Sequence, residues 1–188
     1  MKKVVFVDRD GVINEDPAGW TEHSYVTKWE YFRFLPGSID ALRMLNEAGY
    51  SIVVISNQGG ISKGFYTIPE LNEVNRRMLE EVFAQGARIE KVYYCVHKTE
   101  DNCGCKKPKT GLFRKAEEEL GVKAAGSFFI GDGLTDVEAG INAGLRPILV
   151  MSGKTGMEDA VRSGLKPEHI CRDLKAAVEY ILKEENIG

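Results

Sequence analysis

Apolar and polar residues along this chain of 188 residues follow two periods, one typical of buried strands and one typical of helices. Short, nearly continuous apolar runs predict strands at residues 3–8, 51–56, 90–95, 127–131 and 146–151. Apolar residues at helical spacing predict helices near residues 39–48, 71–83, 112–120, 137–143 and 174–181. This alternation indicates an α/β fold, with a mainly parallel sheet covered by helices on both faces.

Two carboxylates follow the first predicted strand. Asp8 and Asp10 come directly after the apolar run, and Gly11 ends it. Open α/β sheets bind ligands at the carboxyl ends of their strands. Like charges this close repel each other, and a divalent cation that prefers oxygen ligands is the simplest compensation. Taken alone, such a pair is more often a solvated acidic turn, so the interpretation depends on the rest of the chain.

Polar groups also follow the second and fourth predicted strands. Ser56, Asn57 and Gln58 precede two glycines and offer donors for a phosphate group, although a plain turn has the same composition. Asp132 lies between glycines after the fourth strand, which favours a ligand role. Asp136 could instead belong to the first turn of the next helix, where a negative charge is favourable.

A basic segment precedes the third predicted helix. Lys106, Lys107 and Lys109 surround a proline. They form either a solvated basic loop or a source of one ammonium group that faces the carboxylates and an anionic substrate.

Three of the four cysteines lie close together with one histidine. Cys95, His97, Cys103 and Cys105 fall within eleven residues, whereas Cys171 is distant. Three thiolates and one imidazole are a set that structural Zn²⁺ binds tetrahedrally. We therefore expect a zinc-binding loop at about residues 95–107. The alternatives are reduced cysteines with an unrelated histidine, or a redox pair.

The segment 15–36 fits neither period and is rich in aromatic residues. It is long for a connection, and such connections are usually functional or disordered. Because it follows the acidic pair, we expect a substrate-facing loop. Its aromatic residues could equally serve only as anchors, and His23 is more plausibly structural than a substrate contact.

Composition limits the function classes. Hydrophobic residues make up 43% and charged residues 28%, with a net charge of -3, which argues against nucleic-acid coating. No apolar stretch approaches the roughly 20 residues of a membrane span. The first strand begins almost at once, with no secretory leader. We expect one domain over residues 1–188, a cytoplasmic monomer with no nucleic-acid or membrane partner.

The order of these motifs resembles the haloacid dehalogenase (HAD) superfamily of phosphohydrolases across about residues 4–150. That resemblance implies a Rossmann-like HAD fold, and here no large cap domain. It makes Asp8 the nucleophile that forms an aspartyl-phosphate, and Asp10 the general acid and then base. Lys107 would stabilise negative charge.

The same resemblance implies the binding groups. Mg²⁺ would be held by Asp8, the backbone carbonyl of Asp10 and Asp132, with Asp136 in a supporting role. Ser56 and Asn57, within the turn that includes Gln58, would bind the phosphoryl oxygens.

The Cys/His pattern, followed by two lysines and a proline, resembles one subgroup, the heptose 1,7-bisphosphate 7-phosphatases, with histidinol-phosphate phosphatases as close relatives. Lys63 and Lys106 would then contact the second phosphate of a small phosphorylated sugar. Both stand where the heptose enzymes carry arginine, which keeps the charge but loses bidentate binding.

Two alternatives remain. A cationic substrate such as histidinol phosphate would prefer acidic groups at the pocket mouth, and Glu15, Asp16 and Glu22 keep that alternative open against Lys63. A non-catalytic, zinc-stapled binding module is disfavoured because the catalytic set is intact.

Overall fold

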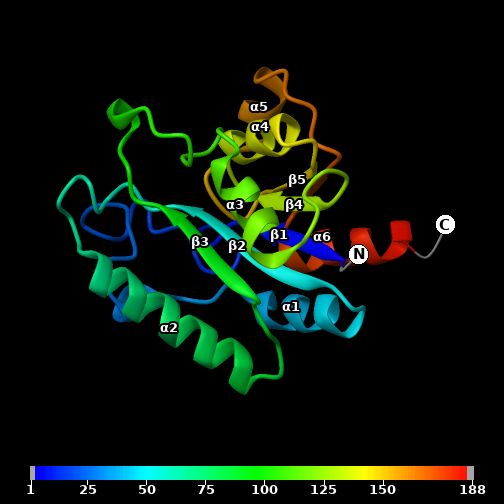
Figure 1. Cartoon of the computed structure of the whole chain (residues 1–188), viewed down its shortest axis with the longest axis horizontal. Helices are drawn as coiled ribbons and strands as arrows, with labels where there is room; N and C mark the ends of the chain where they lie inside the picture. Colours follow the sequence, from blue (N-terminus) through cyan, green and yellow to red (C-terminus); the bar gives the residue numbers. More distant parts are fainter. Residues whose placement is uncertain (1–2, 186–188) are drawn as a thin grey trace.

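A single parallel sheet organises the molecule. The computed structural model describes residues 3–185. Its six strands run in the order β3-β2-β1-β4-β5-β6 (Figure 1). Their bounds are Val4–Val7 (β1), Ser51–Asn57 (β2), Lys91–Cys95 (β3), Phe128–Gly131 (β4), Arg146–Val150 (β5) and His169–Cys171 (β6). The strands β2 and β4 flank β1, so the carboxyl ends of these three strands lie side by side.

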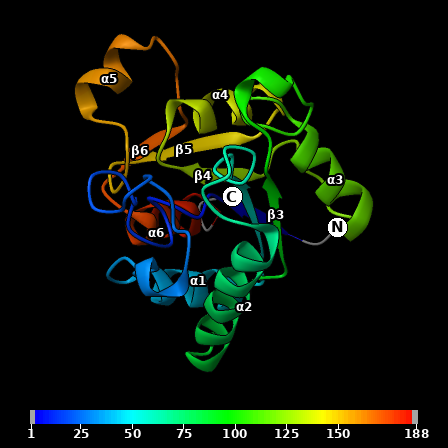
Figure 2. The ribbon, with the colours of Figure 1, turned by 90° about the vertical axis from the view of Figure 1, so that its left-hand side faces the viewer.

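Helices cover both faces of the sheet (Figure 2). They are α1 (Ser38–Glu47), α2 (Ile68–Ala84), α3 (Gly111–Leu120), α4 (Leu134–Asn142), α5 (Met157–Arg162) and α6 (Leu174–Glu185). Alternate side chains of β1 serve the two faces, as period two requires. Val5 and Val7 pack in the core formed with α1, α2 and α6, whereas Val4 and Phe6 pack with α3 and α4.

The predicted α/β architecture is confirmed, with some differences in detail. The short elements α5 and β6 were not predicted, because six and three residues are too few to display a period. The helix α4 begins at Leu134, so Asp136 lies in its first turn. Across residues 3–185, no connection adds a further domain over the sheet edge.

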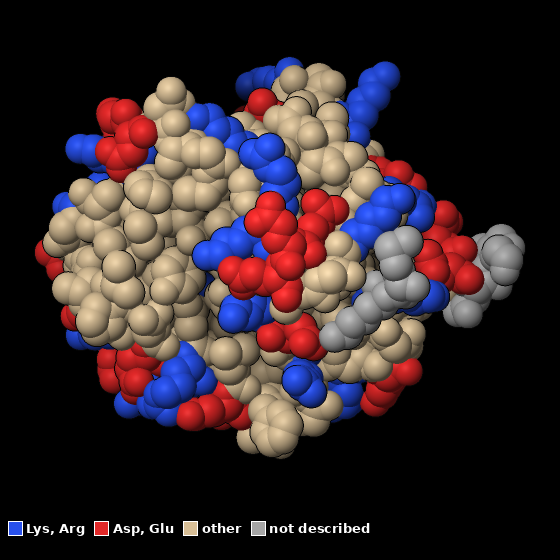
Figure 3. All heavy atoms as spheres, viewed as in Figure 1, with Lys and Arg blue, Asp and Glu red and all other residues tan. Residues whose placement is uncertain are grey.

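The surface of the described residues carries charges of both signs. On the face shown in Figure 3, acidic side chains gather over α3, with basic side chains beside them. This face therefore presents no continuous basic patch. Among residues 3–185, no helix is long and apolar enough to cross a membrane.

Candidate active site

Asp8 and Lys107 form a buried ion pair at the carboxyl end of β1. The Lys107 ammonium lies 3.0 Å from Asp8 Oδ2 and 2.7 Å from Asp136 Oδ1, and it donates a hydrogen bond to the carbonyl of Ile55 at 2.9 Å. Lys107 is 3% exposed. Burial opposes its charge, but the two carboxylates outweigh burial and raise the pKa of Lys107, so this side chain stays cationic.

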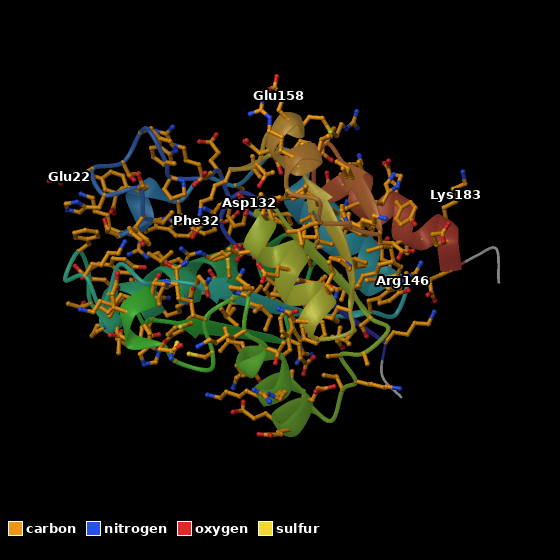
Figure 4. The ribbon with its side chains drawn as sticks, turned by 90° about the horizontal axis from the view of Figure 1, so that it is seen from above. Glu22, Phe32, Asp132, Arg146, Glu158 and Lys183 are labelled. Carbon is orange, nitrogen blue, oxygen red and sulfur yellow. The ribbon has the colours of Figure 1, made fainter. Side chains whose placement is uncertain are left out.

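Asp132 follows β4 and is enclosed by two glycines. A Cβ added to Gly11 would lie 2.4 Å from Asp132 Oδ2, and one added to Gly153 would lie 2.1 Å from it. The backbone N–H of Lys154 donates to the same oxygen at 2.8 Å. In Figure 4, Asp132 lies inside the molecule, whereas Glu22 projects from the outer edge of the aromatic loop. Only glycine, which has no Cβ, lets the backbone at positions 11 and 153 approach the Asp132 carboxylate so closely.

The carboxylates of Asp8, Asp132 and Asp136 offer oxygens that lie within 4.8 Å of one another, and all three side chains are buried. Burial raises the pKa of Asp132 to about 8, and the charges of Asp136 and Asp8 add to this. Burial also raises the pKa of Asp8 to about 6, against the opposing charge of Lys107. The charges of Lys107 and Lys154 oppose this effect, but the pKa of Asp132 and that of Asp8 stay raised, so these two ammonium groups do not balance the three carboxylates. The donor set therefore fits a divalent cation that prefers oxygen.

Asp10 has the opposite environment. Its carboxylate accepts from Arg9 Nε and Nη2 at 3.1–3.2 Å, from Asn14 Nδ2 at 2.9 Å and from Gln58 Nε2 at 2.9 Å. Burial favours the neutral acid, but the charge of Arg9 and these hydrogen bonds outweigh burial and lower the pKa of Asp10. Asp10 is therefore ionised in the free protein at neutral pH.

Polar side chains at the end of β2 and directly after it connect these groups. Gln58 donates from Nε2 to both Asp10 and the hydroxyl oxygen of Ser56, the latter at 2.8 Å. Because Ser56 accepts this bond, its own O–H remains available to donate. Asn57 exchanges two hydrogen bonds with the backbone of Lys107, at 3.0 and 3.1 Å. The side chain of Asn57 thus fixes the segment that carries Lys107.

The predicted zinc ligands meet at one point. Cys95 ends β3, and His97, Cys103 and Cys105 belong to the loop that follows. Their sulfur–sulfur and sulfur–nitrogen separations are 3.1–3.6 Å. Four ligands around a tetrahedral zinc ion, with Zn–S near 2.3 Å, stand about 3.5–3.8 Å apart. The arrangement fits Zn²⁺ after a small expansion.

Two lysines predicted at the pocket mouth lie on different loops. Lys106 Nζ donates to the carbonyl of His97 at 3.3 Å, and Lys63 Nζ lies 3.4 Å from the hydroxyl of Tyr25. A cavity of about 320 Å³ lies beside Lys107. Its polar lining includes Asn57, Lys98, Asn102, Lys106, Lys109 and Thr135.

The aromatic loop has two parts with different partners. Trp29 stacks on Phe32 at 5.1 Å, and Phe32, 8% exposed, packs in the core, so this part is an anchor. His23 stacks on Phe65 at 4.2 Å, and Tyr25 lies 5.9 Å from the same ring. This second part therefore packs on the segment that follows β2.

Sequence patterns did not identify several residues that support the site. Arg9 and Asn14 bind Asp10, Asn75 binds Arg9, and Tyr66 binds Gln58. The available signal was an arginine at the end of an apolar strand, where a charge needs a partner.

Comparisons with known proteins agree with this geometry. Residues 104–177 match the HAD-hydrolase-like family model. The chain is 36% identical over 152 residues to a D-glycero-beta-D-manno-heptose-1,7-bisphosphate 7-phosphatase of Pseudomonas putida, covering 81% of this chain and 84% of that one. It is 33% identical to the Bordetella bronchiseptica enzyme of the same name, covering 97% and 99%.

Solved structures that resemble this chain include two heptose bisphosphate phosphatases. The crystal structure of D,D-heptose 1,7-bisphosphate phosphatase from B. bronchiseptica, complexed with magnesium and phosphate, has a TM-score of 0.88 at 32% identity and covers 97% of this chain and 99% of that one. The corresponding enzyme from Burkholderia thailandensis has a TM-score of 0.71 at 32% identity, with coverage of 96% and 99%.

Proposed function

Because the chain belongs to the HAD-like family of heptose 1,7-bisphosphate phosphatases, we propose that it is a Mg²⁺-dependent phosphomonoester hydrolase that removes the 7-phosphate of D-glycero-D-manno-heptose 1,7-bisphosphate. The observation that carries this proposal is the buried group of Asp8, Lys107 and Asp132 at one sheet edge, next to the separately held Asp10. The relatives are named for the beta anomer, so we propose that anomer as the substrate.

Asp8 and Asp132, with the backbone carbonyl of Asp10, would hold the Mg²⁺ ion. When bound, the ion supplies positive charge that offsets part of the negative charge of the carboxylates and the phosphate. Asp136 has another role, because its Oδ1 pairs with Lys107 and its Oδ2 accepts from the N–H of Gly133 at 2.9 Å. These contacts support a role for Asp136 in positioning Lys107 from the first turn of α4.

Asp8 acts as the nucleophile. A carboxylate oxygen of Asp8 bonds to phosphorus as the bond from phosphorus to the sugar oxygen breaks, which gives an aspartyl-phosphate. Lys107, 3.0 Å from Asp8, stabilises the negative charge that builds on the transferring group. The hydroxyl of Ser56 donates to a phosphoryl oxygen, and Asn57 keeps Lys107 in place.

Asp10 moves the proton. It gives a proton to the departing sugar oxygen and later takes one from the water that attacks the aspartyl-phosphate. Asp10 is ionised in the free protein, and an incoming phosphate dianion raises its pKa by like-charge repulsion. Substrate binding thereby favours the protonated form that the first step needs.

The second phosphate requires cationic groups outside the reaction centre. Lys106 and the other lysines that line the 320 Å³ cavity supply them on one side of Lys107, and Lys63 supplies another across the turn after β2. Lysine contacts a phosphate as a point charge, whereas arginine can bind two phosphate oxygens at once. We therefore expect these lysines to hold the second phosphate electrostatically without fixing its orientation strictly.

Zn²⁺ bound by Cys95, His97, Cys103 and Cys105 would be structural, since all four ligands come from protein. Lys107 follows Cys105 by two residues, so a fixed zinc loop also fixes the catalytic ammonium.

The similarity to the heptose bisphosphate phosphatases of P. putida and B. bronchiseptica does not favour the histidinol-phosphate alternative or the non-catalytic alternative.

We further propose that residues 1–188 act as one domain and as a monomer in the cytoplasm, without nucleic-acid or membrane partners. Size-exclusion chromatography with light scattering tests the monomer, and a mass of twice 20.9 kDa would contradict it.

The substrate assignment is tested by phosphate release with Mg²⁺ from the alpha and beta anomers of the heptose bisphosphate and from histidinol phosphate. We expect kcat/KM for the beta heptose to exceed that for histidinol phosphate at least about 100-fold, which is about 2.7 kcal/mol of transition-state discrimination. The opposite preference would refute the substrate assignment, and activity that survives Asp8→Asn would refute the nucleophile.

A further inference from the structure

Arg9 is a charged side chain with no exposure to solvent, and it stands between the two catalytic carboxylates in sequence. A buried guanidinium costs several kcal/mol unless it is paired and hydrogen-bonded. The catalytic steps proposed above give Arg9 no role. The hydrogen bonds and the ion pair of Arg9 show which groups offset the cost of burying its charge.

The guanidinium has two fixed points. On one side, Nε donates to Asp10 Oδ1 at 3.2 Å, and Nη2 donates to Oδ1 and Oδ2 at 3.1 Å each. On the other side, Nη1 donates to Asn75 Oδ1 at 3.1 Å. Asn75 is 7% exposed and belongs to α2, a helix packed against the sheet. The planar fork of arginine matches a carboxylate in a way that lysine cannot.

The remaining contacts of Asp10 are single hydrogen bonds from two other buried side chains. Asn14 Nδ2 and Gln58 Nε2 each provide one hydrogen bond, and the hydroxyl of Tyr66 in turn donates to Gln58. Among the described residues, only Arg9 contacts both carboxylate oxygens, and only Arg9 is tied through Asn75 to a long helix. Without that tie, each carboxylate oxygen would keep one amide donor, Asn14 for Oδ1 and Gln58 for Oδ2, and no single rigid group would bridge the two oxygens.

We propose that Arg9, held by Asn75, is a positioning residue that fixes the carboxylate of Asp10 for proton transfer to the leaving oxygen. This inference rests on the proposed function, in which Asp10 is the general acid. Rate depends steeply on the placement of an acid, and an error of about 1 Å can cost about 100-fold. Arg9 touches neither the substrate nor the reacting atoms in this scheme.

The test separates proton transfer from general damage by comparing two leaving groups. An aryl phosphate such as p-nitrophenyl phosphate releases a stable phenolate that needs no proton, whereas the sugar oxygen of the heptose bisphosphate needs one. Leaving-group release is measured in single turnovers with excess enzyme, so that hydrolysis of the aspartyl-phosphate does not contribute. Asp10→Asn provides the reference pattern.

We expect Asn75→Ala and Arg9→Lys to slow release from the sugar substrate about 10- to 100-fold and release from the aryl substrate less than about threefold. Asn72→Ala is the matched control, because this residue lies on the same helix, is exposed, and accepts a hydrogen bond from Tyr94 rather than from Arg9. We expect this control to match the wild type on both substrates.

Equal losses on both substrates for Asn75→Ala, or wild-type rates for Arg9→Lys, would overturn the inference, because a structural role or mere charge would then suffice. If Asp10→Asn itself slows both substrates equally, the acid role assigned in the proposed function fails instead. Thermal melting of each variant identifies loss of folding. Asn75→Ala keeps Arg9 and Asp10 intact, so a misfolded Arg9 variant does not prevent the test.

Discussion

Replacing Asp132 by asparagine should stabilise the Mg²⁺-free protein while it destroys Mg²⁺-dependent activity. Asp132 is 2% exposed and shares its surroundings with the carboxylates of Asp8 and Asp136, with Lys107 as the cation that pairs with both of these. An asparagine keeps the size of the side chain and can still accept from the N–H of Lys154. It removes one of the three mutually repelling charges.

The magnitude follows from the pKa of Asp132, which burial and neighbouring charges raise from 3.8 to about 8. Between these values the folded state retains a proton that the unfolded state has lost, so the stability of the Mg²⁺-free protein falls as pH rises through this window. A shift of about four units corresponds to a limit of about 5 kcal/mol above pH 8. Asparagine is also desolvated, and the carboxylates share the repulsion, so we expect a gain of about 2–3 kcal/mol at pH 8.

The assay is thermal unfolding at pH 5 and pH 8, in buffer freed of Mg²⁺ with the zinc site left loaded. We expect Asp132→Asn to raise the Tm by about 4–12 °C at pH 8 and by much less at pH 5. Added Mg²⁺ should stabilise the wild type and not the variant. Glu118→Gln, a change at an exposed position of α3, serves as the control and should leave the Tm nearly unchanged. An unchanged or lower Tm for Asp132→Asn at pH 8 would refute the argument.

Three further predictions concern the buried ion pair of Lys107, the space beside Asp132 and the zinc loop. Lys107→Met should lower the stability of the Mg²⁺-free protein by about 3 kcal/mol in urea unfolding at pH 8, because breaking a buried ion pair leaves the carboxylates uncompensated; an unchanged midpoint would contradict this. Gly153→Ala places a Cβ 2.1 Å from Asp132, so the Mg²⁺ concentration for half activity should rise at least about tenfold, whereas Gly156→Ala, with 3.7 Å of space, should match the wild type. Cys103→Ala should lose bound zinc, stability and turnover, and equal zinc content by elemental analysis would exclude the metal site.

The sequence predicted the position of the site because the sheet makes local motifs converge. Asp8, Ser56 and Asp132 each follow a short apolar run, and parallel strands place such ends at one edge. The order β2-β1-β4 then brings the three side chains together, although they are far apart along the chain. The Cys/His cluster could be predicted from the sequence equally well, since its members lie close together at the end of β3 and in the loop that follows.

The sequence did not predict contacts that depend on how a side chain turns in three dimensions. Asn57 follows Ser56 directly and was interpreted only as a phosphate donor, whereas its amide also bonds to the backbone of Lys107. Arg9 could equally have pointed to solvent, and only the burial of its guanidinium against Asn75 identifies a role. Gly153 carried no signal, because its importance is the space that it leaves for Asp132.

Asp8 and Asp10 are two residues apart, and the protein gives them opposite surroundings. Asp8 faces the other carboxylates, and its pKa is raised to about 6 by burial, with Lys107 opposing that rise. Asp10 faces Arg9, Asn14 and Gln58, and its pKa is lowered despite burial. Paired carboxylates with diverging environments mark a division of roles between them. The lowered pKa of Asp10 suits its proposed role as the base that activates water. In the proposed mechanism, the acid step then depends on the substrate phosphate, which would raise the pKa of Asp10 when there is a leaving group to receive the proton.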